Sequence, residues 1–136
     1  MDNDGPLLTG VKARKMALTV THRVEEGFGV LQLAGPLTLG PSLSGLREAA
    51  RQLLANAKLT GLILQVAEVT SVDSAGLGEL TIVYNFANRQ SMGIRLVGST
   101  PSLLKMLDMT RLEELLPPAK DMQSAKQELL AKKNLC

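Results

Sequence analysis

The feature that most constrains this chain is a nearly continuous apolar run, LILQVAEV, at residues 62–69. A strand of this composition is typical of the middle of a parallel sheet, where both faces of the strand are covered. Helical periodicity resumes at residue 75, after a short polar segment. We therefore expect a central strand that leads directly into a helix, which is the local arrangement of α/β proteins.

Helical spacing of apolar side chains is clearest over residues 42–58. Leucines and alanines there fall on one face, and charged residues fall elsewhere, as in an amphipathic helix packed on a core. Pro41 suits the first helical position, because its missing N–H costs nothing there. The same spacing predicts three further helices: one over 75–90, one that opens at Pro101 and one over 121–133.

The first part of the chain predicts a β-hairpin. Residues 17–24 alternate apolar and polar side chains, residues 29–35 are largely apolar, and Glu26-Gly27 between them is a turn signal. Two further strands are expected, a short one over 93–98 and a weak one around 112–116.

Strands that alternate with helices are joined by right-handed crossovers, which favour a mainly parallel sheet. The opening hairpin adds one antiparallel pair. The predicted fold class is therefore mixed α/β. We expect a single domain over residues 17–133, preceded by a loose N-terminal arm at 1–16.

Composition excludes several classes of function. The net charge is only +2 and aromatic residues make up 2%, which argues against a nucleic-acid partner. One histidine and one cysteine leave no basis for a metal site or a disulfide framework. The apolar runs are too short for membrane insertion, and the N-terminus does not resemble a signal peptide. We expect a cytoplasmic domain without a cofactor.

The most informative segment is the predicted strand-to-helix junction at residues 69–80, VTSVDSAGLGEL. A helix start presents unpaired N–H groups and the positive end of the helix dipole. Asp73 or Ser74 can cap those groups, and a phosphate could bind there as well. Gly76 and Gly78 allow close approach of a neighbouring backbone. A purely structural interpretation, in which the cap and glycines serve packing, stays open.

No arrangement of residues supports catalysis. The glycines lack the following lysine of a Walker-type nucleotide site. Ser74 has no base nearby in the sequence, because the single histidine, His22, belongs to the first predicted strand. The adjacent pairs Glu25-Glu26 and Glu113-Glu114 are expected to be solvated. We therefore expect a protein that is not an enzyme and has no catalytic residue.

Three segments together resemble the STAS domain of anti-sigma factor antagonists: GFGVLQLAGPL (27–37), LTGLILQVAEVTSVDSAGLGEL (59–80) and GIRLVG (93–98). The resemblance implies a mainly parallel sheet of four to five strands, with about four helices packed mainly on one side. It also implies a function in binding. A typical member binds an anti-sigma factor that is a GHKL-type serine kinase, and so regulates transcription.

In that family the kinase phosphorylates a hydroxyl at the third position of an Asp-Ser-Ser/Thr-Gly motif. Ala75 stands at that position here, and Ser74 matches the hydroxyl that is not phosphorylated. Two further positions that often carry an acidic residue in the family carry uncharged residues here, Gln65 and Thr38. These departures favour a binding module that is not controlled by phosphorylation at the standard position.

Two alternatives stay open. One is a phosphorylation switch through Ser74, or through Ser71 or Thr70. The other is a scaffold subunit of a stressosome-like complex or of a lipid-transport ATPase. A homodimer is compatible with each of these hypotheses.

The resemblance and the junction together predict a partner-binding face at one end of the sheet. Gly76→Val is expected to weaken partner binding more than fold stability. The residues predicted to contact the partner are Thr38, Ser71, Asp73, Ser74, Ala75, Gly76 and Leu77.

Overall fold

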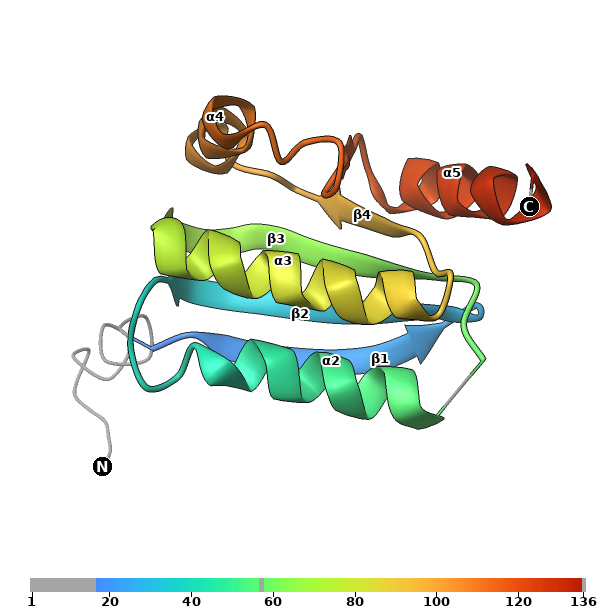
Figure 1. Ribbon diagram of the computed structural model, residues 1–136, viewed down its shortest axis with the longest axis horizontal. Helices are drawn as coiled ribbons and strands as arrows, with labels where there is room; N and C mark the ends of the chain where they lie inside the picture. The colour runs from blue at the N-terminus through green and yellow to red at the C-terminus, as the bar shows by residue number, and fades with distance from the viewer. Residues whose placement is uncertain (1–16, 57, 136) are drawn as a thin grey trace.

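The computed structural model describes residues 17–56 and 58–135. The predicted arm at 1–16 lies outside the described residues, and the assignment of 17–133 to one domain stays a prediction. Figure 1 shows the helices and strands in the order β1 (Thr19–Glu25), β2 (Phe28–Leu37), α2 (Ser44–Asn56), β3 (Gly61–Val72), α3 (Ser74–Arg89), β4 (Ile94–Val97), α4 (Pro101–Thr110), β5 (Pro118–Ala119) and α5 (Met122–Leu135).

The strands form one five-stranded sheet in the order β1-β2-β3-β4-β5. β1 pairs with β2 antiparallel, and the other neighbours are parallel. The hairpin turn has positive φ angles at Glu26 (53°) and Gly27 (84°), the combination that matches the twist of two-residue hairpins. The mixed, mainly parallel α/β sheet predicted from the sequence is confirmed.

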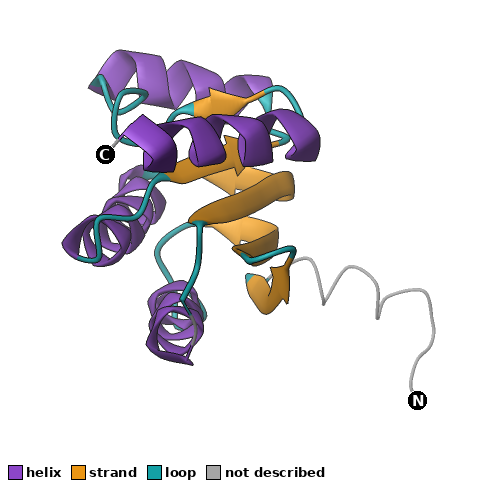
Figure 2. Cartoon of the chain, turned by 90° about the vertical axis from the view of Figure 1, so that its right-hand side faces the viewer, coloured by secondary structure: helices purple, strands orange, loops and turns teal. Residues whose placement is uncertain are grey.

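Helices cover the two sides of the sheet unequally. On β3, Leu62 and Leu64 belong to a large apolar cluster, and Ile63 between them points to the other face. Side chains of α2, α3 and α4 complete the large cluster, whereas Ala125 and Leu129 of α5 cover the smaller one. In Figure 2 helices lie to the left of the strands, below them and across the top of the view. The expectation of helices mainly on one side is confirmed.

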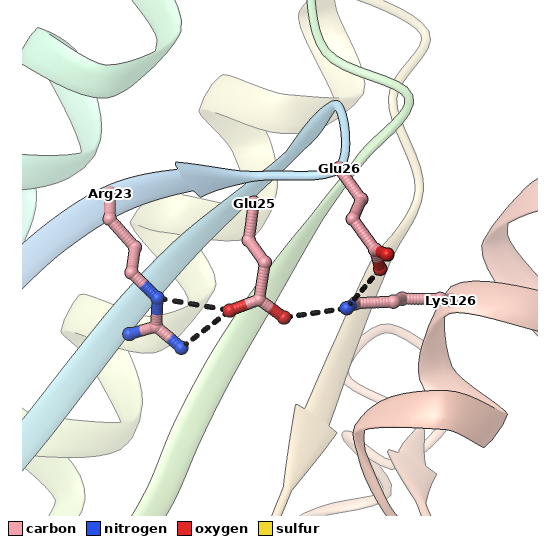
Figure 3. A network of polar contacts seen from close by, with 4 residues as sticks. All are labelled: Arg23, Glu25, Glu26 and Lys126. Atoms are coloured by element: carbon pink, nitrogen blue, oxygen red, sulfur yellow. Dashed lines mark hydrogen bonds and ion pairs between the residues drawn. The ribbon is translucent and has the colours of Figure 1, made fainter.

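An ionic contact links α5 to the opening hairpin (Figure 3). Lys126 Nζ donates hydrogen bonds to Glu25 Oε2 at 2.5 Å and to Glu26 Oε1 at 2.6 Å. Arg23 binds the other oxygen of Glu25 at 3.0 Å. The contact joins residues about a hundred positions apart in the sequence. It attaches α5, the last helix, to the turn between β1 and β2.

Two local predictions are wrong. Residues 112–116 form a turn, in which the N–H of Leu116 donates to the carbonyl of Leu112 and the Leu116 side chain is fully buried. The fifth strand comes later and has two residues. Pro41 does not begin a helix either, because residues 41–43 form a turn and α2 starts at Ser44.

Candidate functional site

Asp73 organises the end of the sheet where the sequence predicted a binding face. Its Oδ1 accepts a hydrogen bond from the N–H of Gly76 at 2.9 Å, which makes it the N-cap of α3. Its Oδ2 accepts a second bond from the N–H of Leu39 at 3.0 Å. One carboxylate therefore joins the β2–α2 loop to the start of α3.

These backbone donors also set the electrostatics of the helix start. The N–H of Leu39 and then that of Gly76 lower the pKa of Asp73 below its usual value of 3.8. Because the Asp73 carboxylate already accepts these N–H groups, it stands where an external anion would have to bind. A phosphate at this helix start, which the sequence left open as a possibility, would have to compete with the protein's own side chain.

Gly76 and Leu77 belong to the core. A Cβ atom on Gly76 would lie 1.9 Å from the carbonyl oxygen of Leu37, so no other residue fits there without a shift of the backbone. Leu77 is 4% exposed and packs in the large cluster. Both residues are buried in this structure, and their contact with a partner stays a prediction. The close approach of Leu37 means that Gly76→Val would also cost fold stability.

Ser71 is separated from the rest of the predicted face. The next residue, Val72, packs against the large cluster, so alternation along β3 turns Ser71 toward the opposite face of the sheet. Its register partner on β2 is Pro36. Ser71 is exposed, but it does not lie on the same side as the start of α3.

The remaining predicted residues lie together. Ser74 is the first residue of α3 and is exposed, while Thr38 and Ala75 are partly buried. In Figure 1 the β2–α2 loop and the start of α3 lie at the same end of the sheet. We call the set Thr38, Leu39, Ser74 and Ala75 the α3-start surface.

Leu39 is the member of this surface that the sequence predictions missed. It is 80% exposed, although leucine is an apolar residue. The hydrogen bond from its N–H to Asp73 fixes the backbone that presents it. The signal was a leucine within the turn sequence Thr38-Leu39-Gly40-Pro41, where an apolar side chain has no neighbouring core position.

The other candidates for chemistry are dispersed. His22 is exposed on β1, opposite Leu31 of β2, and not on the α3-start surface. Within residues 17–56 and 58–135, no three histidine, cysteine, aspartate or glutamate side chains are grouped closely enough to hold a metal ion. Over the same ranges, none of the helices has the length and apolar character needed to cross a membrane.

The fold and site define a mixed α/β domain whose most organised polar feature is a capped strand-to-helix junction. A family model for the STAS domain matches residues 19–125. The chain belongs to the STAS domain family, as the sequence resemblance indicated. A search of curated protein sequences found no match.

Solved structures share the fold at low sequence identity. An anti-sigma factor antagonist from Mycobacterium paratuberculosis has 18% identity and a TM-score of 0.66, over 83% of this chain and 94% of that one. The antagonist SpoIIAA in its unphosphorylated form has 15% identity and a TM-score of 0.59, over 85% and 98%. A chain of the stressosome, a signal integration and transduction hub, has 19% identity and a TM-score of 0.60, over 85% and 97%.

Proposed function

We propose that this chain is a non-enzymatic regulatory module that binds an anti-sigma factor of the GHKL serine-kinase type. The observation that carries the proposal is the α3-start surface, where Asp73 fixes an exposed apolar side chain, Leu39, beside the start of α3. A protein partner would bury Leu39 and contact Ser74 and Ala75 around it. Similarity of fold to anti-sigma factor antagonists supports the choice of partner.

Rigidity of the surface favours recognition of a folded partner. The β2–α2 loop is held by the Asp73 carboxylate, and the N–H of Asp73 itself donates to the carbonyl of Leu37 at 3.3 Å. A surface that is already ordered loses less conformational entropy on binding than a mobile loop does. Leu39 and its neighbours therefore fit a role in stable association.

Phosphorylation at the standard position is excluded by chemistry, since alanine has no hydroxyl. The neighbouring hydroxyl, that of Ser74, is exposed at the first position of α3. A phosphoryl group there would lie near the Asp73 carboxylate and add about −1.5 to −2 charges to a surface meant for contact. We therefore propose a partner contact without the usual switch, and Ser74 phosphorylation as the alternative.

The test uses the full chain and purified GHKL-type anti-sigma kinases from the same genome. Calorimetry should detect one-to-one binding to one of them, and Leu39→Asp should weaken it at least tenfold, while Lys105→Asp on α4 should not. Incubation with ATP followed by intact mass should leave the native chain unmodified, and Ala75→Ser should gain one phosphoryl group. Phosphorylation of the native chain that disappears in Ser74→Ala would establish the alternative switch instead.

A scaffold role is the second candidate, because the stressosome chain has the same fold over 85% of this sequence. A scaffold subunit would self-associate into large particles. Light scattering of the purified chain at increasing concentration separates the two: a monomer or dimer agrees with the antagonist proposal, and a high-mass assembly overturns it.

A further inference from the structure

A second surface feature lies at the far end of α2 and α3, away from the α3-start surface. It is a groove of about 320 Å³ between the C-terminal halves of the two helices, which lie side by side in Figure 1. The size is at the lower end of the range for sites that take a ligand or a side chain of a partner. The groove is lined by Arg51, Leu54, Ala55, Phe86, Arg89 and Gln90.

The lining combines two cations with an apolar floor and includes no acidic residue. The guanidinium of Arg51 lies over the ring of Phe86, 5.4 Å from its centre. This stacking holds the charge at the wall of the groove. Leu54 is a buried residue, so the bottom of the groove is continuous with the core.

The charges of both arginines are available to a ligand. Within the described part of the chain, Arg51 has one ion-pair partner, Glu48, at 3.3 Å, and both side chains are more than half exposed to solvent. Exposed pairs of this kind are weak and exchange readily. The Arg89 side chain is exposed, and its guanidinium makes no hydrogen bond or ion pair with any residue that the structure describes.

Helix stabilisation explains only part of this arrangement. Arg89 is in the last turn of α3, where a cation interacts favourably with the helix dipole. That effect does not require a second guanidinium from α2, nor an aromatic ring in the same groove. The convergence of residues from two helices on one apolar groove is what points to a partner.

We propose that this groove docks an acidic segment of a second protein partner. A carboxylate of the segment would lie between Arg51 and Arg89, where planar guanidinium groups bind carboxylates with paired hydrogen bonds. An apolar side chain next to that carboxylate would pack on Phe86 and Leu54. Charge complementarity thus selects a glutamate- or aspartate-rich segment with an aromatic or aliphatic neighbour.

The position of the groove gives it a separate role from the α3-start surface. The two features lie at opposite ends of α3, whose sixteen residues span about 24 Å at 1.5 Å per residue. Two partners can therefore bind at once, and the chain would act as a bridge between them. This inference does not depend on which partner binds at the start of α3.

The test is a titration of the isotope-labelled full chain with a capped hexapeptide of alternating glutamate and phenylalanine, followed by NMR. Backbone amides of the six groove residues should shift together, with the change concentrated at Phe86, Arg89 and Gln90. The same peptide with glutamine in place of glutamate should bind at least tenfold more weakly. Raising the salt concentration to about 0.5 M should weaken binding of the acidic peptide but not of the glutamine peptide, because salt screens the attraction between charges.

Matched variants keep the proposal falsifiable. Arg89→Glu should reduce the affinity for the acidic peptide at least tenfold, and Arg89→Lys should restore part of it. Lys105→Glu is the control, since it reverses an exposed cation on α4 outside the groove. Shifts scattered over the whole surface, or equal loss of affinity in Arg89→Glu and Lys105→Glu, would overturn the proposal. An unaltered fold is verified for each variant by its amide spectrum without peptide.

Discussion

Arg47 of α2 holds the buried carboxylate of Glu79 on α3 through two parallel hydrogen bonds, one of them 3.1 Å from Nε to Oε2. Glu79 is 8% exposed and is the one buried charged residue among those the structure describes. Its pair with Arg47 links α2 to α3, the two helices next to which both proposed binding features lie. The Arg47 pKa is raised, because the Glu79 carboxylate accepts its hydrogen bonds.

Arg47→Met should lower the melting temperature by several degrees, because it leaves the Glu79 carboxylate buried without a partner. The double variant Arg47→Met/Glu79→Met should recover most of that loss, since an apolar pair removes the unpaired charge. Calorimetric melting measures both. Glu48→Ala, which breaks an exposed pair on the same helix, is the control and should change little. If the double variant melts no higher than the single one, the pair stabilises by more than charge compensation.

Gly76 and Gly78 form a natural matched pair, two residues apart on α3. A Cβ on Gly76 would meet the Leu37 carbonyl oxygen at 1.9 Å, whereas one on Gly78 meets nothing within 4 Å. Gly76→Ala should therefore destabilise the fold by about 3 kcal/mol or more, at the upper end of overpacking costs. Gly78→Ala should stabilise it by about 0.5–1 kcal/mol, because alanine favours helix interiors.

Urea denaturation of the two glycine variants measures the difference directly. Similar midpoints for both would contradict the close approach of α3 to the end of β2. Partner binding by Gly78→Ala should equal that of the native chain, because Gly78 lies outside the α3-start surface.

Much of the fold follows from local patterns in the sequence. The continuous apolar run at 62–69 predicts β3, because a strand covered on both faces needs apolar side chains throughout. The helical spacing of apolar residues over 42–58 predicts α2, because a helix buried on one side needs them on one stripe only. The segment 112–116 combines three leucines with two glutamates, a pattern that suits a strand as well as a turn. Tertiary packing decides there, since Leu116 fills the core from a turn.

The site was predictable in part. The sequence predicted either Asp73 or Ser74 as the helix cap, and the structure selects Asp73. The second bond of Asp73, to Leu39, joins residues 34 positions apart and leaves no local signal. Gly76 was interpreted as a contact residue because a missing Cβ permits approach by a partner or by the chain itself. The structure shows that the approaching backbone is that of Leu37. The groove between α2 and α3 depends on how two helices pack, and no sequence motif marks it.

The Asp73 carboxylate should make stability depend on pH. Its pKa in the folded state is lowered below 3.8 by the N–H groups of Leu39 and Gly76. The stabilisation is therefore complete above the unfolded pKa and is lost as pH falls through the lower folded pKa. The difference in melting temperature between the native chain and Asp73→Asn should be constant above about pH 5 and shrink toward zero below pH 3.8.

Asp73→Asn has a second use, because asparagine is also a good helix cap. It can still accept from Gly76 but holds Leu39 less well, having one oxygen in place of two. Partner affinity at the α3-start surface should therefore fall more than stability does. A carboxyl pKa for Asp73 at or above 3.8 in an NMR titration would contradict the hydrogen-bonded geometry.

Lys126 should control how firmly α5 is held to the hairpin. Its ammonium bridges Glu25 and Glu26 and its side chain is 18% exposed, while the Lys126 pKa is raised chiefly by the hydrogen bond to Glu25. Lys126→Met keeps the length of the side chain but removes the link from α5 to Glu25 and Glu26, although Arg23 still pairs with Glu25. The amides of α5 should therefore exchange with deuterium several-fold faster. Amides of α2 and α3 should be unaffected, because these helices pack on the large cluster and α5 on the small one. Lys105→Met is the control, because Lys105 is an exposed lysine on α4. If Lys105→Met accelerates amide exchange in α5 as much as Lys126→Met does, the bridge to the hairpin does not hold this helix in place.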